Sequence, residues 1–341
     1  MRGLKFYDKV LFSVNSMAAV MLLLSYLLPH VEPKKFAFIS ILSLGVPFLI
    51  IVNIIFFIYW LLKVRRQMLL SILVLLLGYQ HVFSLYKFSS SKAIENTSNF
   101  TVMNYNVRLF NVFNWIENKR LKQDLRDFIV EQKPDIINMQ EYRPDDVVLL
   151  KGYHKYVDIT GDKVKTGQAI FSRFPIINSG SIEFPNTSNN AIFADIKKDQ
   201  DTIRIYNVHL QSMGIDPTVE HIANENSKNL VKRVSHTFET QQQQTEMFLE
   251  HKKNCPYKMI VSGDFNNTAY SYVYKNIKGD LQDSFVEAGN GFGRTLNFDF
   301  FPVRIDFIFA ENSFQINGFK NFEVNYSDHF PIIATLNLDS D

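Results

Sequence analysis

Cysteine is almost absent from this chain of 341 residues, which contains only Cys255. A single cysteine excludes an intramolecular disulfide and argues against a cysteine-ligated zinc site. Two glycine-dependent motifs are also missing, the G-x-x-x-x-G-K phosphate loop and the G-x-S-x-G turn. The glycine-rich run at 289–293 (GNGFG) does not follow a strand pattern. The sequence therefore gives little support for a nucleotide-binding loop or a serine hydrolase.

Acidic residues are scarce in the first 92 positions, where Asp8 and Glu32 stand beside ten lysines and arginines. This part carries a formal charge of +8, and the rest of the chain carries −6. A basic, apolar part followed by an acidic, polar part indicates two different surroundings, a membrane and water.

Three long apolar runs occur in the basic part, at residues 10–28, 36–62 and 68–86. Each is near the roughly 20 residues that a helix needs to span a bilayer. A cleaved signal peptide is disfavoured for the first run, because no small-x-small cleavage site follows it and two more runs come directly after. A buried core helix is disfavoured for the second, which has no charge. We predict three transmembrane helices in residues 1–88, a polar linker at 89–99 and a separate polar domain at 100–341.

The basic residues predict an orientation. Six lie at the N-terminus and in the loop at 63–66, against four on the other side of the predicted spans. The positive-inside rule then places the N-terminus in the cytoplasm. With three spans, the domain at 100–341 lies outside, which in a Gram-negative cell is the periplasmic side of the inner membrane. The lipid bilayer is thus one expected partner, and the sequence indicates no protein partner.

The polar part alternates strand and helix patterns. Strands are predicted at 100–107, 135–140, 168–172, 191–197, 202–210, 258–262, 303–310 and 331–338, with a hairpin turn at 199–201. Helices are predicted at 117–131 and over most of 217–253, with the glutamines at 241–244 on a solvated face. Many short strands with interspersed helices favour an α+β sandwich.

Polar side chains recur where the predicted strands end, and strand ends are where sites are commonly assembled. They are Asn106, Glu141, His209, Asp264, Asn266, Asp306, Asp328 and His329. Most of them, taken singly, have an ordinary structural explanation as turn residues or hydrogen-bonded core residues. Asp306 is harder to explain, because a carboxylate among apolar neighbours costs several kcal/mol unless it is paired. As a set, the oxygen-rich groups suit Mg²⁺ or Mn²⁺ better than zinc.

These residues lie in segments that resemble, in order, the motifs of the endonuclease/exonuclease/phosphatase superfamily. The segments are MNYNVR, NMQEY, YNVHLQS, SGDFNN, RIDFIF and SDHFPI, and the similarity covers about residues 100–338. The resemblance implies a four-layer α/β sandwich with two central β-sheets. It also implies metal-dependent cleavage of a phosphoester.

The resemblance also implies a role for each residue. The metal, Mg²⁺ or Mn²⁺, would be held by Glu141, Asn106 and Asp328, the last as a direct or outer ligand. The reaction itself would use Asp264 to orient water, Asn266 to hold a phosphate oxygen, His329 paired with Asp306, and His209 at the phosphate or leaving oxygen. A further family-like segment, GQAIFSRFPI, contributes Gln168 as a structural residue and Arg173 as a phosphate-contact candidate.

The substrate class stays open among a lipid head group, a small phosphodiester and nucleic acid, because the superfamily shares one catalytic core. The run His209-Leu210-Gln211 resembles the sphingomyelinase-type motif, and a charge of −6 suits duplex DNA poorly. Both favour a lipid or small phosphodiester. The alternatives are a membrane-anchored nuclease and a non-catalytic membrane scaffold with a degenerate site. The scaffold would be favoured by loss of Glu141, Asp264 or His329, and all three are present.

Overall fold

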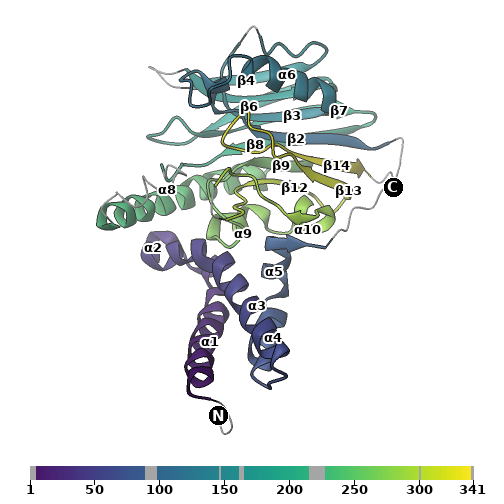
Figure 1. Cartoon of the computed structure of the whole chain (residues 1–341). Coiled ribbons are helices and arrows are strands. Elements are labelled where there is room, and N and C mark those ends of the chain that lie inside the picture. The colour runs from purple at the N-terminus through teal and green to yellow at the C-terminus, as the bar shows by residue number, and fades with distance from the viewer. Residues whose placement is uncertain are drawn as a thin grey trace.

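The computed structural model describes residues 5–88, 98–145, 147–160, 165–214, 227–298 and 301–338. A bundle of helices occupies one end of the molecule, and a domain of two β-sheets with flanking helices occupies the other (Figure 1). The N-terminus lies at the end of the bundle that is farthest from the sheets.

The first sheet has six strands, and its last strand along the chain lies beside its first. The order is β13 (Phe314–Asn321), β14 (Ile332–Leu338), β2 (Phe100–Asn106), β3 (Ile136–Tyr142), β5 (Thr166–Ser172) and β4 (His154–Thr160). Strands β2 and β3 are parallel, and the other neighbours are antiparallel.

The second sheet repeats this plan with one central parallel pair, β8 and β9. Its order is β10 (Gln282–Asp283), β12 (Asp306–Ala310), β9 (Lys258–Asp264), β8 (Asp201–His209), β7 (Asn190–Lys198) and β6 (Ile176–Glu183). In both sheets, therefore, the carboxyl ends of two parallel central strands lie side by side.

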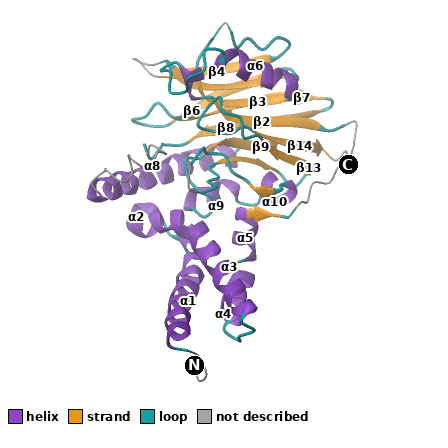
Figure 2. Cartoon of the chain, in the orientation of Figure 1, coloured by secondary structure: helices purple, strands orange, loops and turns teal. Residues whose placement is uncertain are grey.

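The domain has four structural layers, two sheets with helices on their outer faces (Figure 2), and three apolar clusters hold them together. Isoleucines and phenylalanines of both sheets fill the space between them, and α10 (Ser284–Ala288) closes one side. Helix α6 (Leu121–Gln132) covers the outer face of the first sheet. Helices α8 (Ser227–Lys253) and α9 (Tyr272–Lys278) cover that of the second. The predicted four-layer sandwich with two central sheets is confirmed.

Several predicted boundaries were wrong. Strand β3 continues through Glu141 to Tyr142, helix α6 begins at Leu121, and β12 begins at Asp306. Strands β4, β6 and β13 were not predicted; all three lie at sheet edges. An edge strand buries few side chains, so it lacks the apolar pattern on which the prediction depends. Most side chains of β4 and β6 are indeed partly or fully exposed.

The predicted third span is interrupted. Two segments are long and apolar enough to cross a membrane, Phe6–His30 and Pro33–Leu62. They comprise α1 (Phe6–Ser25), η1 (Leu28–His30), α2 (Pro33–Ile41), η2 (Leu42–Gly45) and α3 (Val46–Leu62). The third run forms α4 (Met68–Leu77) and α5 (Tyr79–Leu85), which bend by 82° at their junction. The count is therefore two spans, or three if the bent pair is one. Most of the predicted linker, residues 89–97, lies outside the described residues.

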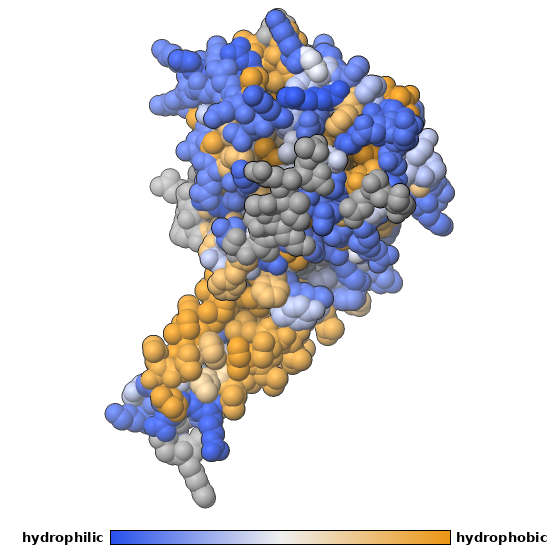
Figure 3. Space-filling model, turned by 90° about the vertical axis from the view of Figure 1, so that its right-hand side faces the viewer, coloured by the Kyte–Doolittle hydropathy of each residue, from blue (hydrophilic) through white to orange (hydrophobic). Residues whose placement is uncertain are grey.

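The helical bundle is apolar outside and polar at selected points inside. Asn15 donates to Ser71 Oγ at 2.7 Å and accepts from Trp60 Nε1 at 3.0 Å. At the end far from the sheets, Lys63 Nζ lies 2.6 Å from Asp8 Oδ1. Leucine, valine and phenylalanine side chains cover the outer surface between a polar tip and the polar domain (Figure 3). Satisfied polar groups between helices with an apolar exterior are typical of membrane bundles.

The bundle is joined to the catalytic domain at several points. The backbone N–H of Lys34 in α2 donates to Gln242 Oε1 of α8 at 2.8 Å, and the Lys34 ammonium pairs with Glu246. Tyr270 donates to the carbonyl of His81 at 3.2 Å. Strand β1 (Tyr86–Lys87) pairs with β11 (Gly291–Phe292). The predicted boundary at residue 88 thus follows a strand that is already paired with the catalytic domain.

Candidate active site

The two parallel strand pairs bring the predicted site residues to one edge of the sandwich. Asn106 ends β2, opposite Gln140 of β3. His209 ends β8, directly opposite Asp264 at the end of β9. Because β12 runs antiparallel to β9, its first residue, Asp306, also lies opposite Asp264. The carboxyl ends of four central strands therefore meet the start of a fifth.

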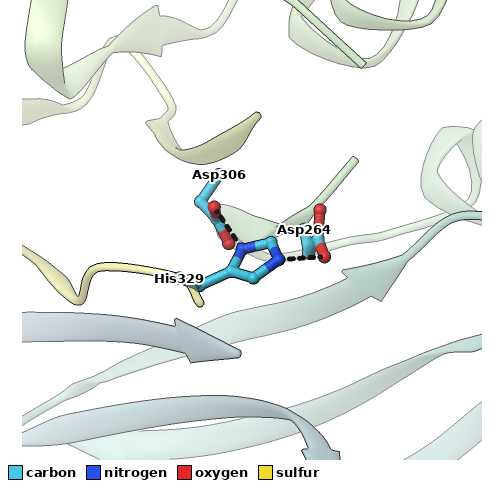
Figure 4. A group of neighbouring side chains, drawn as sticks. All are labelled: Asp264, Asp306 and His329. Carbon is cyan, nitrogen blue, oxygen red and sulfur yellow. Dashed lines mark hydrogen bonds and ion pairs between the residues drawn. The ribbon is translucent and has the colours of Figure 1, made fainter. Parts of the chain in front are cut away.

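His329 and two aspartates form the buried centre of this edge (Figure 4). The Nδ1–H of His329 donates to Asp306 Oδ2 at 2.9 Å, and its Nε2 lies 3.7 Å from Asp264 Oδ2. Burial opposes the imidazolium, but the carboxylates of Asp306 and Asp264 outweigh it and raise the pKa of His329 well above its usual value. His329 is therefore held with Nε2 facing Asp264 and with a strong tendency to carry a proton.

Asp264 is a buried carboxylate at the centre of the site. Burial raises its pKa to about 6, although the charge of His329 acts in the opposite direction. Its Oδ1 accepts the backbone N–H of Asn266 at 2.8 Å, and its Oδ2 accepts the amides of Asn106 at 3.0 Å and Asn266 at 3.2 Å. The hydrogen bonds that fix the side chain thus come from neutral donors, and the cation that faces it is the imidazolium of His329.

Glu141 is a second carboxylate without a cationic side chain. Within the described residues it forms no ion pair with lysine or arginine, and its partner is Asn106 Nδ2 at 3.3 Å. Burial, and next the charge of Asp328, raise the pKa of Glu141. The Asn106 amide thus donates to Glu141 and Asp264 together. Glu141 and Asp264 are hard carboxylate ligands that share the partial positive charge of this one amide. Such a pair of carboxylates fits a divalent cation.

The site is built on strained backbone. Glu141 has φ of 49°, at an irregularity in the pairing of β3 with β5, and Asn266 also has φ of 49°. Four consecutive residues after β2, Arg108 to Asn111, have φ between 42° and 59°. Left-handed backbone costs about 1–2 kcal/mol per non-glycine residue. Strain at this density is typical of functional sites, where the surrounding structure must hold it.

His209 faces Asp264 from the neighbouring strand. Burial lowers its pKa, so the imidazole is neutral near pH 7. Its Nε2 lies 3.9 Å from Asp264 Oδ2 and has no hydrogen-bond partner within the described residues. A buried ring nitrogen without a partner is costly unless it binds something. It is available to a substrate oxygen.

Asp328 lies beside the centre, on the rim. Its Oδ2 lies 3.2 Å from Arg108 Nε, and its side chain is partly exposed. The neighbouring Ser327 hydroxyl donates to the carbonyl of Asn106 at 2.8 Å and accepts the N–H of His329 at 3.2 Å. Asp328 is therefore already paired with an arginine, whereas Glu141 and Asp264 form no ion pair with lysine or arginine within the described residues.

A layer of buried amides supports the site, and it was not predicted. Gln140 donates to Asn104 Oδ1 at 2.8 Å and to Asn207 Oδ1 at 2.6 Å. Asn104 donates to Asp306 Oδ1 at 3.4 Å. The signal was present in the sequence, because Asn104 and Asn207 each stand two residues before a site residue and so point to the same face of their strand.

A cleft of about 200 Å³ opens beside the centre; Glu141 and His209 line it, whereas Asp264, Asp306 and His329 do not. Gln168 lines it and donates to Asn190 at 2.6 Å, in keeping with a structural role. Arg173 does not approach it. Residue Ser172, next to Arg173, pairs with Ile136 at the start of β3, and the Arg173 guanidinium contacts Tyr153. The prediction of Arg173 as a phosphate contact was wrong, because β5 runs antiparallel to β3 and carries it to the opposite edge.

The glutamines of α8 are not on a solvated face, contrary to prediction. Gln241, Gln242 and Gln244 are buried, and Gln243 is exposed. Gln241 donates to the carbonyls of Gln211 at 2.8 Å and Asn266 at 3.2 Å, while Gln244 accepts the N–H of Gln211 at 2.8 Å. These side chains hold the loops that follow His209 and Asp264. The sequence of a glutamine run does not show whether its side chains form hydrogen bonds with water or with buried backbone groups.

Comparison with known proteins identifies the family. The model of the endonuclease/exonuclease/phosphatase family matches residues 103–329, which span Asn106 through His329. The chain belongs to this family. A second family model, described as a domain of unknown function, matches residues 8–85. A search of curated proteins finds no match.

Solved structures share the fold. A family member from Bacteroides vulgatus is 20% identical, with a TM-score of 0.57 over 71% of this chain and 100% of that one. The human Nocturnin catalytic domain with bound sulfate is 17% identical, with a TM-score of 0.54 over 72% of this chain and 95% of that one. Humanized D. rerio TDP2 is 19% identical, with a TM-score of 0.53 over 71% and 100%.

Proposed function

We propose that this family member is a membrane-anchored, metal-dependent hydrolase that cleaves a phosphodiester at the edge occupied by Asp264 and His329. The observation that carries the proposal is the convergence of Glu141, Asp264 and the His329–Asp306 pair on one buried point. A structural role explains such a group poorly, since burying three carboxylates around one imidazolium costs more stability than their pairing returns.

The side chains have distinct roles in this proposal. Glu141 and Asn106 hold Mg²⁺ or Mn²⁺, with Asp328 as an outer ligand, and the bound cation supplies charge neutralisation at the phosphate. Asp264 accepts a proton from the attacking water. The imidazolium of His329, oriented by Asp306, donates to a phosphate oxygen and stabilises the charge that develops there. His209 and Asn266 contact the remaining oxygens.

The cleft supports a small phosphodiester or a lipid head group as substrate. Its volume of about 200 Å³ is below the range of roughly 300–1,000 Å³ that is usual for sites that enclose drug-sized ligands. Its described lining contains no lysine or arginine. Binding to duplex DNA depends on such residues. The N-terminal helices would also keep the site close to lipids.

The test is a panel of substrates on the purified full chain in detergent. We expect turnover of bis-p-nitrophenyl phosphate or a phospholipid with Mg²⁺ or Mn²⁺, and none after EDTA. Full activity in EDTA, or rescue by Zn²⁺ alone, would refute the metal assignment.

A nuclease is the second candidate, because a structural neighbour favours it. D. rerio TDP2 complexed with single-strand DNA product is 17% identical, with a TM-score of 0.53 over 70% of this chain and 100% of that one. Plasmid and single-strand cleavage at about 50 and 200 mM salt distinguishes the two candidates. Efficient cleavage with a steep loss of binding at the higher salt would identify a nuclease.

A further inference from the structure

A second cleft, of about 570 Å³, lies between the helical bundle and the catalytic domain. Its walls come from η1 and α5 on one side and from the end of α9 and the start of α10 on the other. They include His30, Gln80, Phe83, Lys275, Lys278 and Glu287. None of the candidate active-site residues lines it, so it is a separate site.

The cleft lies at the ends of α1 and α4, where the apolar helices meet the domain of two sheets. A Cβ atom on Gly78 would stand 2.0 Å from the ring of Tyr26, so α1 and α4 end in direct contact. Beyond these ends, Tyr79 and Phe83 are exposed and meet edge to face at 6.1 Å, and Lys87 Nζ lies 5.0 Å from the Phe83 ring. Aromatic and basic residues gather in this way at the boundary between acyl chains and head groups.

The cleft carries charges of both signs. Lys275 and Lys278 lie in the last turn of α9, and Lys275 Nζ is 3.0 Å from His30 Nδ1. Of the three lining carboxylates, Asp283 is taken up by Arg304 and by Tyr274, each at 2.7 Å. Asp280 and Glu287 are exposed and form no ion pair within the described residues. Two lysines and two carboxylates without an ion pair thus line the same cleft.

We propose that this cleft binds the head group of a phospholipid that carries a primary ammonium, as phosphatidylethanolamine does. Lys275, Lys278 and His30 hold the phosphate, and Glu287 with Asp280 holds the ammonium. Tyr79 and Phe83 lie at the glycerol level, and the acyl chains follow the exposed leucines of α4. The proposal rests on the membrane-anchoring part of the proposed function and is independent of catalysis.

The test uses the full chain in mild detergent with added phosphatidylethanolamine, phosphatidylglycerol or phosphatidylcholine, and native mass spectrometry as the readout. We expect the wild type to retain phosphatidylethanolamine at least tenfold better than the other two. The double variant Lys275→Glu/Lys278→Glu should lose this retention. A charge-matched control, Lys133→Glu/Lys320→Glu, changes exposed lysines away from the cleft and should keep it.

Glu287→Gln separates head-group recognition from general anion binding. It should remove the preference for phosphatidylethanolamine over phosphatidylglycerol while phosphate binding remains. Equal retention of the three lipids by the wild type, or equal loss in the control, would overturn the proposal. Alkaline carbonate extraction distinguishes a failure of membrane anchoring from a failure of the lipid site. A chain released by carbonate contradicts membrane anchoring, whereas a retained chain without lipid preference contradicts only the lipid site.

Discussion

At the scale of single residues, the site is defined by two carboxylates, Asp264 and Glu141, that form no ion pair with lysine or arginine within the described residues. Asp264 and Glu141 are surrounded by amide donors, and the positive charge nearest to Asp264 is that of His329. A protein tolerates such groups when something else, a proton or a cation, completes them. Two predictions follow from this property, one on turnover and one on stability.

Conservative changes at the centre should abolish most turnover. We expect Asp264→Asn and His329→Gln each to reduce kcat by about 10²–10⁴, the usual effect of losing one positioned acid–base group. Asp306→Asn should reduce it as well, because His329 then loses the acceptor that orients its ring. Asp199→Asn, on an exposed hairpin turn, is the control and should be neutral. Near-normal kcat in His329→Gln would contradict the assignment.

Metal should stabilise the protein more at high pH than at low pH. The pKa of Asp264 is about 6 in the folded protein, against an ordinary value of 3.8. At pH values between these two, Asp264 is protonated in the metal-free folded protein and ionised in the unfolded chain. The free energy of unfolding therefore falls as pH rises. The raised pKa of His329 acts in the same direction, with its contribution lost as pH rises through that pKa. The lowered pKa of His209 opposes both.

Burial also raises the pKa of Glu141, the proposed metal ligand, which shares the Asn106 amide with Asp264. A divalent cation held by Glu141 would displace its proton and favour the ionised form of Asp264. The increase in Tm caused by Mg²⁺ or Mn²⁺ over EDTA should therefore be larger at about pH 8 than at about pH 5.5. Thermal unfolding at the two pH values measures it, and Asp264→Asn should reduce the difference. A Tm increase that is equal at both pH values would show that the metal does not replace these protons.

At the scale of elements, helix α8 links the site loops to the N-terminal helical bundle. Its buried glutamines bind the backbone after His209 and Asp264 on one side and the start of α2 on the other. Gln241→Leu should lower kcat and destabilise the fold by about 1–3 kcal/mol, because buried carbonyls lose their donor. Gln243→Leu, one position away and exposed, is the matched control. Equal effects of the two changes would contradict a positioning role for Gln241.

What the sequence predicted follows from how each element is stabilised. Strands such as β2, β8 and β9 are buried on both faces, so apolar runs revealed them, and the polar residue that ended each run marked the site. The edge strands β4 and β6 lack that pattern and were missed. The buried glutamines of α8 and the bend at Gly78 were also beyond prediction, because each depends on a partner distant in sequence, Gln211 for the glutamines and Tyr26 for the glycine.

At the scale of the whole molecule, the arrangement of the helices bears on orientation. The N-terminus and the loop after α3 lie at the end of the bundle away from the catalytic domain (Figure 1). We expect this end in the cytoplasm and the catalytic domain outside, which is what three crossings and the basic residues predict. Alkaline phosphatase fused after Asp341 should be active, and the same enzyme fused after Arg66 should be inactive. The reverse pattern would mean that one of the three runs does not cross.

The position of β14 has a consequence for how the protein is made. It is the last strand along the described residues, yet it lies between β13 and β2, the first strand of that sheet. The first sheet therefore stays open until β14 has been synthesised, and His329 precedes β14 by only three residues. For a chain whose catalytic domain is exported, the helices enter the bilayer long before the site exists. Such a hydrolase would be inactive throughout its time in the compartment that synthesises it.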